Sequence, residues 1–297
     1  MWKNCLKTLL GCSGAALIKG LRLGPAKFLS ASSRSFDACN PFEQKSGEAA
    51  MLLANIPEVK LLTIIGDRKP SIQITVRNYE DGMLPTERAI ALLAIAVAEK
   101  PKGILEIGTF CGHTTNLLAQ NLRDALIHTI DLPIDFSAET DRSQNIPKDD
   151  FHLIRQRIVG REYKNQPGSE RIVQHFGDTA DYNFSLIGNA NFFFIDGSHT
   201  YEYCKNDSEK CYRLCNGKGT FLWHDCDISH MGVLRFLNEW RTLGRNIVRI
   251  QGTSLAYFKQ QLTRQPNASA PELDLVERDE GENSQEVKLP TYSPYRI

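Results

Sequence analysis

Five acidic residues follow apolar runs in this sequence, at the points where buried strands are expected to end. They are Glu106, Asp131, Asp178, Asp196 and Asp225. A carboxylate at the end of a core strand adds nothing to apolar packing, although any one of them could cap the helix that follows. Because ligands of an open parallel sheet bind beyond the carboxyl ends of its strands, the set predicts a ligand site there.

Histidines accompany two of these acids. Asp196 lies three residues before His199, and His224 immediately precedes Asp225. Neighbouring parallel strands are about 4.8 Å apart, so carboxylates from two strand ends could reach one small cation. Oxygen ligands without a thiolate favour Mg²⁺ or Mn²⁺ over Zn²⁺. An imidazole with a pKa of about 6.5 could then remove the proton of a substrate hydroxyl, so we expect Asp196 and Asp225 to bind metal and the two histidines to serve catalysis.

The remaining histidines and the cysteines are expected to be structural. The histidines in this group are His113, His128, His152, His175 and His230. The eight cysteines show no Cys-x-x-Cys spacing, and a chain of this size needs no disulfides. They are therefore expected to be reduced thiols in a cytoplasmic protein, and Cys111 a small buried thiol.

A loop containing Gly108 and Gly112 joins the apolar run at 104–107 to a helical pattern. Glycine lets the backbone approach a ligand closely, but the Gly-x-Gly-x-x-Gly pattern of dinucleotide sites is missing. The spacing Glu-x-Gly-x-x-x-Gly resembles motif I of class I S-adenosylmethionine-dependent methyltransferases. This resemblance implies that both glycines leave room for the amino-acid part of the cofactor, and that Glu106 lies near that part or holds the loop in shape.

Two further acids are expected to contact the same cofactor. Asp131 ends the second predicted strand, where a carboxylate can accept hydrogen bonds from both ribose hydroxyls of an adenosine. Asp178 lies where the resembling family places an acid beside the adenine amino group. Glu106, Gly108, Gly112, Asp131 and Asp178 are therefore the predicted binding residues for S-adenosylmethionine.

A second resemblance is carried by residues 195–203 (Ile-Asp-Gly-Ser-His-Thr-Tyr-Glu-Tyr) and by the Trp-His-Asp sequence at 223–225. These stretches are similar to metal-dependent O-methyltransferases of the macrocin type, which act on sugar hydroxyls, and more distantly to catechol-type enzymes. The resemblance spans roughly residues 86–259 and implies that Asp196 binds metal and His199 is the base. The family has an acidic pair where this chain has His224 and Asp225. His224 is then a metal ligand, a second base or a residue that orients the substrate.

Strand and helix patterns alternate from residue 86 onward. Strands are expected at 103–108, 126–132, 171–177, 191–196 and 219–225, and helices at 86–99, 113–122, 201–214 and 231–243. Residues 246–251 and 254–259 form two alternating patterns separated by Gly252-Thr253, which favours an antiparallel hairpin. The expected fold is α/β and Rossmann-like, with a doubly wound, mostly parallel seven-stranded sheet that ends in this hairpin, as in class I methyltransferases.

The chain is expected to have three parts. Residues 1–85 form an N-terminal extension and helical lead-in, 86–260 the cofactor-binding domain, and 261–297 a polar tail expected to be disordered. The first 36 residues contain six Lys or Arg and no acid, which fits a transit peptide or, as we favour, an amphipathic helix. The basic residues of 135–170 belong either to a lid over the cofactor or to a solvated face.

Composition excludes some classes of partner. Lysine and arginine total 35 and the acids also total 35, so nothing indicates a general nucleic-acid binder. No apolar run approaches the roughly 20 residues needed for a membrane span. The expected partner is a small molecule with a hydroxyl group, and a homo-oligomer is compatible with the sequence.

The leading hypothesis is therefore an S-adenosylmethionine-dependent O-methyltransferase assisted by a divalent metal. Its acceptor could be a sugar hydroxyl, a phenol or another small alcohol. A nicotinamide-dependent oxidoreductase is the first alternative, opposed by the missing glycine pattern and the terminal hairpin. A non-catalytic binding module is the second, opposed by the grouping of Asp196, His199 and Asp225.

Overall fold

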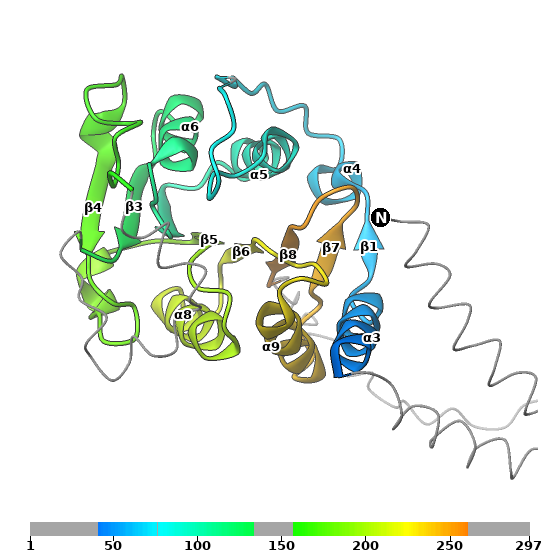
Figure 1. Ribbon diagram of the computed structural model, residues 1–297. Coiled ribbons are helices and arrows are strands. Elements are labelled where there is room, and N and C mark those ends of the chain that lie inside the picture. Colours follow the sequence, from blue (N-terminus) through cyan, green and yellow to red (C-terminus); the bar gives the residue numbers. More distant parts are fainter. Residues whose placement is uncertain (1–40, 76, 134–156, 261–297) are drawn as a thin grey trace, which may run out of the picture. The chain divides into compact units, whose positions relative to one another are not determined.

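A mixed sheet of eight strands organises the part of the chain that the structure describes (Figure 1). The strands are β1 (Glu58–Val59), β2 (Gly103–Ile107), β3 (Leu126–Asp131), β4 (Ile172–Phe176), β5 (Phe192–Ile195), β6 (Thr220–Trp223), β7 (Val248–Ile250) and β8 (Ala256–Lys259), in the spatial order β1-β7-β8-β6-β5-β2-β3-β4. β8 runs antiparallel to β7 and β6, and the other neighbours are parallel. The predicted doubly wound, mostly parallel sheet with a terminal hairpin is confirmed.

The sheet has one strand more than predicted. β1 adds a parallel edge to β7, with Glu58 opposite Arg249. The described part of the expected helical lead-in contains two helices, α3 (Pro41–Ala54) and α4 (Leu61–Ile65), with β1 between them. The carbonyl of Pro57 accepts the N–H of Arg249 at 2.7 Å, so the residues around the proline pair with the sheet edge instead of continuing a helix.

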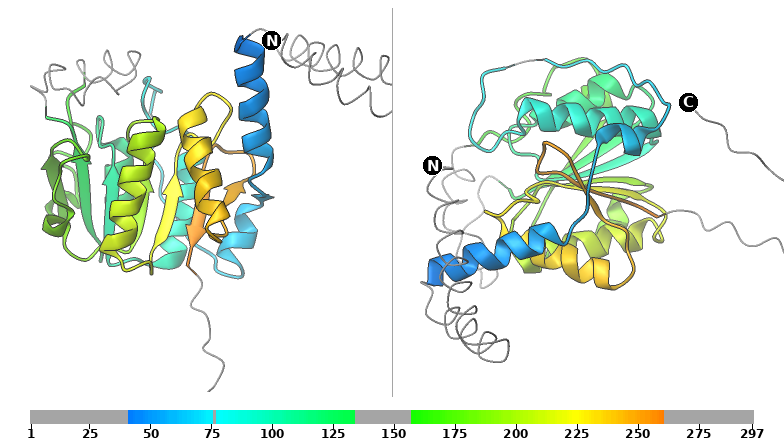
Figure 2. Two further views of the ribbon diagram at one scale, coloured as in Figure 1. Left: turned by 90° about the horizontal axis from the view of Figure 1, so that it is seen from below. Right: turned by 90° about the vertical axis from the view of Figure 1, so that its right-hand side faces the viewer.

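Helices cover both faces of the sheet (Figures 1 and 2). α4, α5 (Thr86–Glu99) and α6 (His113–Asn121) lie on one face, and α3, α8 (Tyr201–Leu214) and α9 (Met231–Thr242) on the other. Phe192 and Phe194 belong to the core beneath α5 and α6, whereas Phe193 and Ile195 pack in the core with α9. A strand buried on both faces needs a continuous apolar sequence, which explains the run in β5.

The short connections include two 3₁₀ helices, η2 (Ser169–Arg171) and η3 (Phe184–Ile187). Helix α5 has the predicted bounds, Thr86–Glu99. Pro85 is the N-cap residue and no side chain caps the helix. Pro85 adopts an extended conformation and the helix begins directly after it, so Thr86 is already inside the first turn.

The structure is a computed structural model that describes residues 41–75, 77–133 and 157–260. These residues belong to one folded unit. Our expectations for the first 40 residues, for the insertion up to residue 156 and for the tail from 261 lie outside the described residues. Within the described ranges no helix is long and apolar enough to cross a membrane.

All five cysteines in those ranges are free, and Cys111 is buried.

Candidate active site

The carboxyl ends of β2, β3, β5 and β6 meet at one edge of the sheet and open into a cavity of about 560 Å³. The backbone N–H of Asp196 donates to Ile107 of β2 at 2.8 Å, and that of His224 donates to Ile195 of β5 at 3.1 Å. Seven of the nine predicted site residues line this cavity: Gly108, Asp131, Asp178, Asp196, His199, His224 and Asp225. Glu106 and Gly112 are not among its lining residues.

Both loop glycines have backbone angles that favour glycine, with φ of +97° at Gly108 and +84° at Gly112. A Cβ on Gly108 would lie 2.1 Å from the carbonyl oxygen of Asp196. A Cβ on Gly112 would lie 2.6 Å from the ring of Tyr163 and 2.9 Å from Cα of Gly160. Both positions therefore require glycine because other parts of the chain lie too close for a side chain. This holds whatever ligand binds beyond the loop.

Glu106 is completely buried beneath this loop. Its Oε2 accepts hydrogen bonds from the hydroxyls of Thr115 and, at 2.6 Å, of Thr129. Oε1 is buried and has no hydrogen-bond partner among the described residues. Burial raises the pKa of Glu106 to about 8, against the opposing effect of the two threonine hydroxyls. Glu106 thus connects α6, the helix that follows the loop, to β3. This position fits the second of the two roles considered for it, in which it holds the loop in shape.

Asp131 lies at the cavity wall and is held by three donors. Its Oδ2 accepts the N–H of Phe110 at 2.7 Å, and its Oδ1 accepts the N–H of Leu132 and an Nη2–H of Arg157, both at 2.7 Å. Burial raises the pKa of Asp131, although Arg157 acts in the opposite direction. A carboxylate has about four acceptor positions, so one position on Oδ2 remains for a ribose hydroxyl unless Arg157 moves.

Asp178 follows β4 and connects this part of the chain to α8. Its Oδ1 accepts the N–H of Ala180, and its Oδ2 accepts the hydroxyl of Tyr203, each at 2.8 Å. Tyr203 also lines the cavity, so Asp178 fixes the position of an aromatic ring beside the predicted adenine position. From the sequence, Tyr203 was recognisable only as part of the 195–203 motif.

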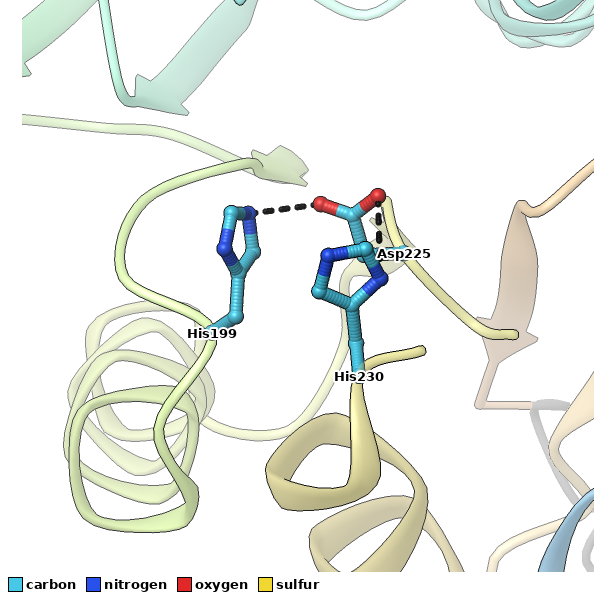
Figure 3. Close-up of side chains that lie close together, drawn as sticks. All are labelled: His199, Asp225 and His230. Atoms are coloured by element: carbon cyan, nitrogen blue, oxygen red, sulfur yellow. Dashed lines mark ion pairs between the residues drawn. The ribbon is translucent and has the colours of Figure 1, made fainter. Parts of the chain in front are cut away.

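Asp225 is the centre of the second group of predicted residues (Figure 3). Nε2 of His199 lies 2.6 Å from its Oδ2, and Nδ1 of His230 lies 3.5 Å from its Oδ1. Nδ1 of His224 is 2.8 Å from Oδ1 of Asp196 and 3.0 Å from Oδ2 of Asp225. Asp225 has a φ of +56°, which few residues other than glycine, asparagine and aspartate adopt. The local strain is offset by contacts from three imidazole rings.

The charges of this group are strongly coupled. Burial raises the pKa of Asp225, but hydrogen bonds from His199 and His224 outweigh this effect and hold the pKa well below its usual range. Burial lowers the pKa of His224, whereas the carboxylates of Asp196 and Asp225 raise it. Two ionised carboxylates therefore attract positive charge to this corner of the cavity.

Arg88 opposes protonation of His224. Its Nη1 lies 2.8 Å from Nε2 of the imidazole, and a guanidinium has no acceptor atom. Nε2 must therefore accept from Arg88, which leaves the ring proton on Nδ1, facing the carboxylates of Asp196 and Asp225. The Arg88 contact therefore favours the neutral ring and acts against the attraction of the two carboxylates for a second proton.

Comparison with known proteins agrees with this architecture. Residues 105–226 match the model of a methyltransferase domain family. This match covers the glycine loop, the strand-end acids, His199 and His224. The chain is an S-adenosylmethionine-dependent methyltransferase. No curated protein matches the sequence.

Solved structures resemble the methyltransferase at low sequence identity. An S-adenosylhomocysteine-bound methyltransferase from Podospora anserina is 16% identical, with a TM-score of 0.43 over 61% of this chain and 81% of its own. The O-methyltransferase TomG from Streptomyces achromogenes, solved with S-adenosylmethionine, is 16% identical, with a TM-score of 0.41 over 61% and 83%. An O-methyltransferase from Bacillus cereus is 13% identical, with a TM-score of 0.42 over 78% and 97%.

The donor set of the methyltransferase fits a divalent ion. Asp196, His224 and Asp225 offer ligand atoms that all lie within 4.8 Å of one another, and His199, Asp225 and His230 form a second such group. Two ligands at right angles, each about 2.1 Å from an ion, are about 3.0 Å apart. The separations of 2.8 and 3.0 Å from His224 Nδ1 to the two carboxylates match that spacing.

Two side chains of this region, Arg88 and His230, were not predicted from the sequence to belong to the site. Arg88 comes from a segment far from the motifs, and its type alone indicates only charged surface. Arg157 belongs to the insertion for which the sequence left a lid or a solvated face open, and its side chain is buried at the cavity wall. His230 was expected to be structural, but it lies against Asp225 and also 3.0 Å from Oδ1 of Asp227. Its position five residues after Asp225, at the start of a predicted helix, was the available signal.

Proposed function

We propose that this methyltransferase transfers the methyl group to a hydroxyl oxygen of a small molecule with the help of a bound Mg²⁺ or Mn²⁺. The observation that supports this proposal is the convergence of His199, His224 and Asp196 on Asp225. A site that transferred methyl groups to a more nucleophilic atom would need no such cluster, whereas a hydroxyl must lose its proton to become a good nucleophile.

The cofactor would occupy the part of the cavity between Gly108, Asp131 and Asp178. S-adenosylmethionine supplies, when bound, an electrophilic methyl group on a sulfonium centre. Asp131 would accept a hydrogen bond from the ribose, and Tyr203, held by Asp178, would border the adenine. The strand register places Gly108 next to Asp196, so the reactive end of the cofactor would lie beside the acidic cluster.

The metal would be held by Asp196, Asp225 and His224. A bound divalent ion lowers the pKa of a coordinated hydroxyl. His199 would take the acceptor proton. Because Nε2 of His199 donates to Asp225, the basic lone pair of the neutral ring is on Nδ1, and Asp225 offsets the charge that develops when Nδ1 is protonated.

A labelling experiment tests this proposal. The protein is incubated with a metabolite extract, Mn²⁺ and S-adenosylmethionine carrying a deuterated methyl group, and the products are analysed by mass spectrometry. We expect the label on hydroxyl oxygens, loss of turnover with EDTA, and cofactor binding that survives EDTA. Turnover that persists after exhaustive chelation would remove the metal from the proposal, and label on nitrogen or carbon alone would remove the hydroxyl acceptor.

A further inference from the structure

Arg88 holds the histidine of the proposed metal site through the ring nitrogen that faces away from the carboxylates. Its Nη1 contacts Nε2 of His224 at 2.8 Å, while Nδ1 of the same ring contacts Asp196 and Asp225. Arg88 lies in the first turn of α5, lines the cavity and has a side chain that is 26% exposed. The imidazole is therefore held between one cation and two anions.

Metal binding at Nδ1 is incompatible with this hydrogen bond. A neutral imidazole carries one proton, so a ring that binds an ion through Nδ1 carries its proton on Nε2. The guanidinium of Arg88 has five N–H donors and no acceptor. Two N–H groups would then face each other across the 2.8 Å that the hydrogen bond now spans. Arg88 must leave Nε2 when His224 binds the ion.

Arg88 makes no strong ion pair with the described residues in its present position. Its only ion pair among them is with Glu87, whose Oε1 is 4.0 Å from Nε and whose side chain is 62% exposed. A pair of this kind contributes little to binding or stability. The released guanidinium would remain at the cavity wall with a fork of donors that fits a carboxylate or phosphate.

We propose that Arg88 binds an anionic group, a carboxylate or phosphate, on the methyl acceptor once a divalent ion has taken Nδ1 of His224. This inference rests on the proposed function and names the class of its acceptor. Ion and acceptor then favour each other's binding, because each requires Arg88 to be away from His224. The charges agree, since Asp196 and Asp225 repel an anion until an ion neutralises them.

Mn²⁺ affinity tests the competition for His224. The free ion is measured by electron paramagnetic resonance with the wild type, Arg88→Met, His224→Ala and the double variant. We expect Arg88→Met to bind Mn²⁺ about tenfold more tightly, because no charge-assisted hydrogen bond has to break. The same change in the His224→Ala background should alter affinity by less than about twofold. Arg235 lies on α9 and pairs with Glu48 of α3. Arg235→Met removes an equal charge there and should match the wild type.

If Arg88→Met bound Mn²⁺ no more tightly than the wild type, Arg88 and the ion would not compete for His224. If Arg88→Met raised the Mn²⁺ affinity equally in the wild-type and in the His224→Ala background, the gain would come from charge repulsion alone. Either result would overturn the proposed competition. Nitrogen-15 spectra of the His224 ring give an independent readout. We expect an unprotonated Nε2 in the metal-free protein and a protonated Nε2 after addition of Mg²⁺. A proton on Nε2 before metal addition would contradict the inference, whatever the affinities are.

A matched pair of probes tests the anionic acceptor. 3-Hydroxybenzoate and 3-hydroxybenzamide are titrated against the Mg²⁺-loaded protein. We expect the wild type to prefer the carboxylate by about tenfold and Arg88→Met to show no preference. Equal affinities in the wild type, including no measurable binding of either probe, would overturn the assignment. Failure of the proposed function would show as no label transfer in the methylation experiment. The binding measurements do not depend on methyl transfer, so the two failures can be told apart.

Discussion

Replacing Glu106 by glutamine should make the protein less sensitive to alkaline pH. Glu106 is fully buried, and its pKa rises from 4.5 to about 8 on folding. A group with a raised folded pKa contributes stability that is complete below pH 4.5 and is lost as the pH rises through 8. Glutamine keeps the shape and can accept from Thr115 and Thr129, but it has no proton to lose.

The magnitude follows from the two pKa values. Each pH unit between them changes the free energy of unfolding by about 1.4 kcal/mol. Between about pH 6 and about pH 8, Glu106 should therefore lower the wild-type stability by about 2 kcal/mol. Glu106→Gln should lack this decrease and be the more stable protein near the upper end of the range.

Urea unfolding at the two pH values, followed by tryptophan fluorescence, measures the difference, because Trp223 and Trp240 are buried in the core. Asp207→Asn is a matched control. Burial raises the pKa of Asp207 only to about 6, so its removal should change the pH dependence in this range by less than about 0.5 kcal/mol. Equal loss of stability in wild type and Glu106→Gln would refute the assignment of a buried, protonated Glu106.

Three further substitutions separate the parts of the site. Asp131→Ala should weaken S-adenosylmethionine binding in calorimetry by at least about tenfold, because a ribose acceptor is lost; unchanged affinity would move the cofactor elsewhere. His199→Gln should reduce turnover by about 10² to 10⁴ while Mn²⁺ and cofactor affinities stay within about twofold, and unchanged turnover would exclude His199 as the base. Asp225→Asn should weaken Mn²⁺ binding by at least about tenfold without weakening cofactor binding; equal losses of both would indicate a folding defect.

The sequence predicted the sheet well because each of its signals is local. The unbroken apolar run of β5 requires burial on both faces, and the Gly252-Thr253 link fits only a short reversal between two strands. β1 escaped prediction because two residues carry no periodicity, and its pairing with β7 depends on a partner far along the chain.

The site was predictable in its residue types but not in its contacts. Strand ends bring Asp131, Asp196 and Asp225 to one edge in any parallel sheet, so their position at the cavity followed from pattern alone. Burial of Glu106 depends on two threonines from different elements, and spacing does not reveal that. Arg88 is 136 residues from His224 in sequence, and only the folded chain shows that it sets the proton position on the ring.

In the mechanism that we propose, strand-end acids and a histidine bind a divalent ion beside the methyl donor. Diffraction from crystals grown with S-adenosylhomocysteine and Mn²⁺, recorded at the manganese absorption edge, tests it most directly. We expect one anomalous peak within coordination distance of Asp196, His224 and Asp225, facing the cofactor sulfur. A cofactor bound in the cavity with no manganese at these three residues, or manganese bound only elsewhere, would contradict the account.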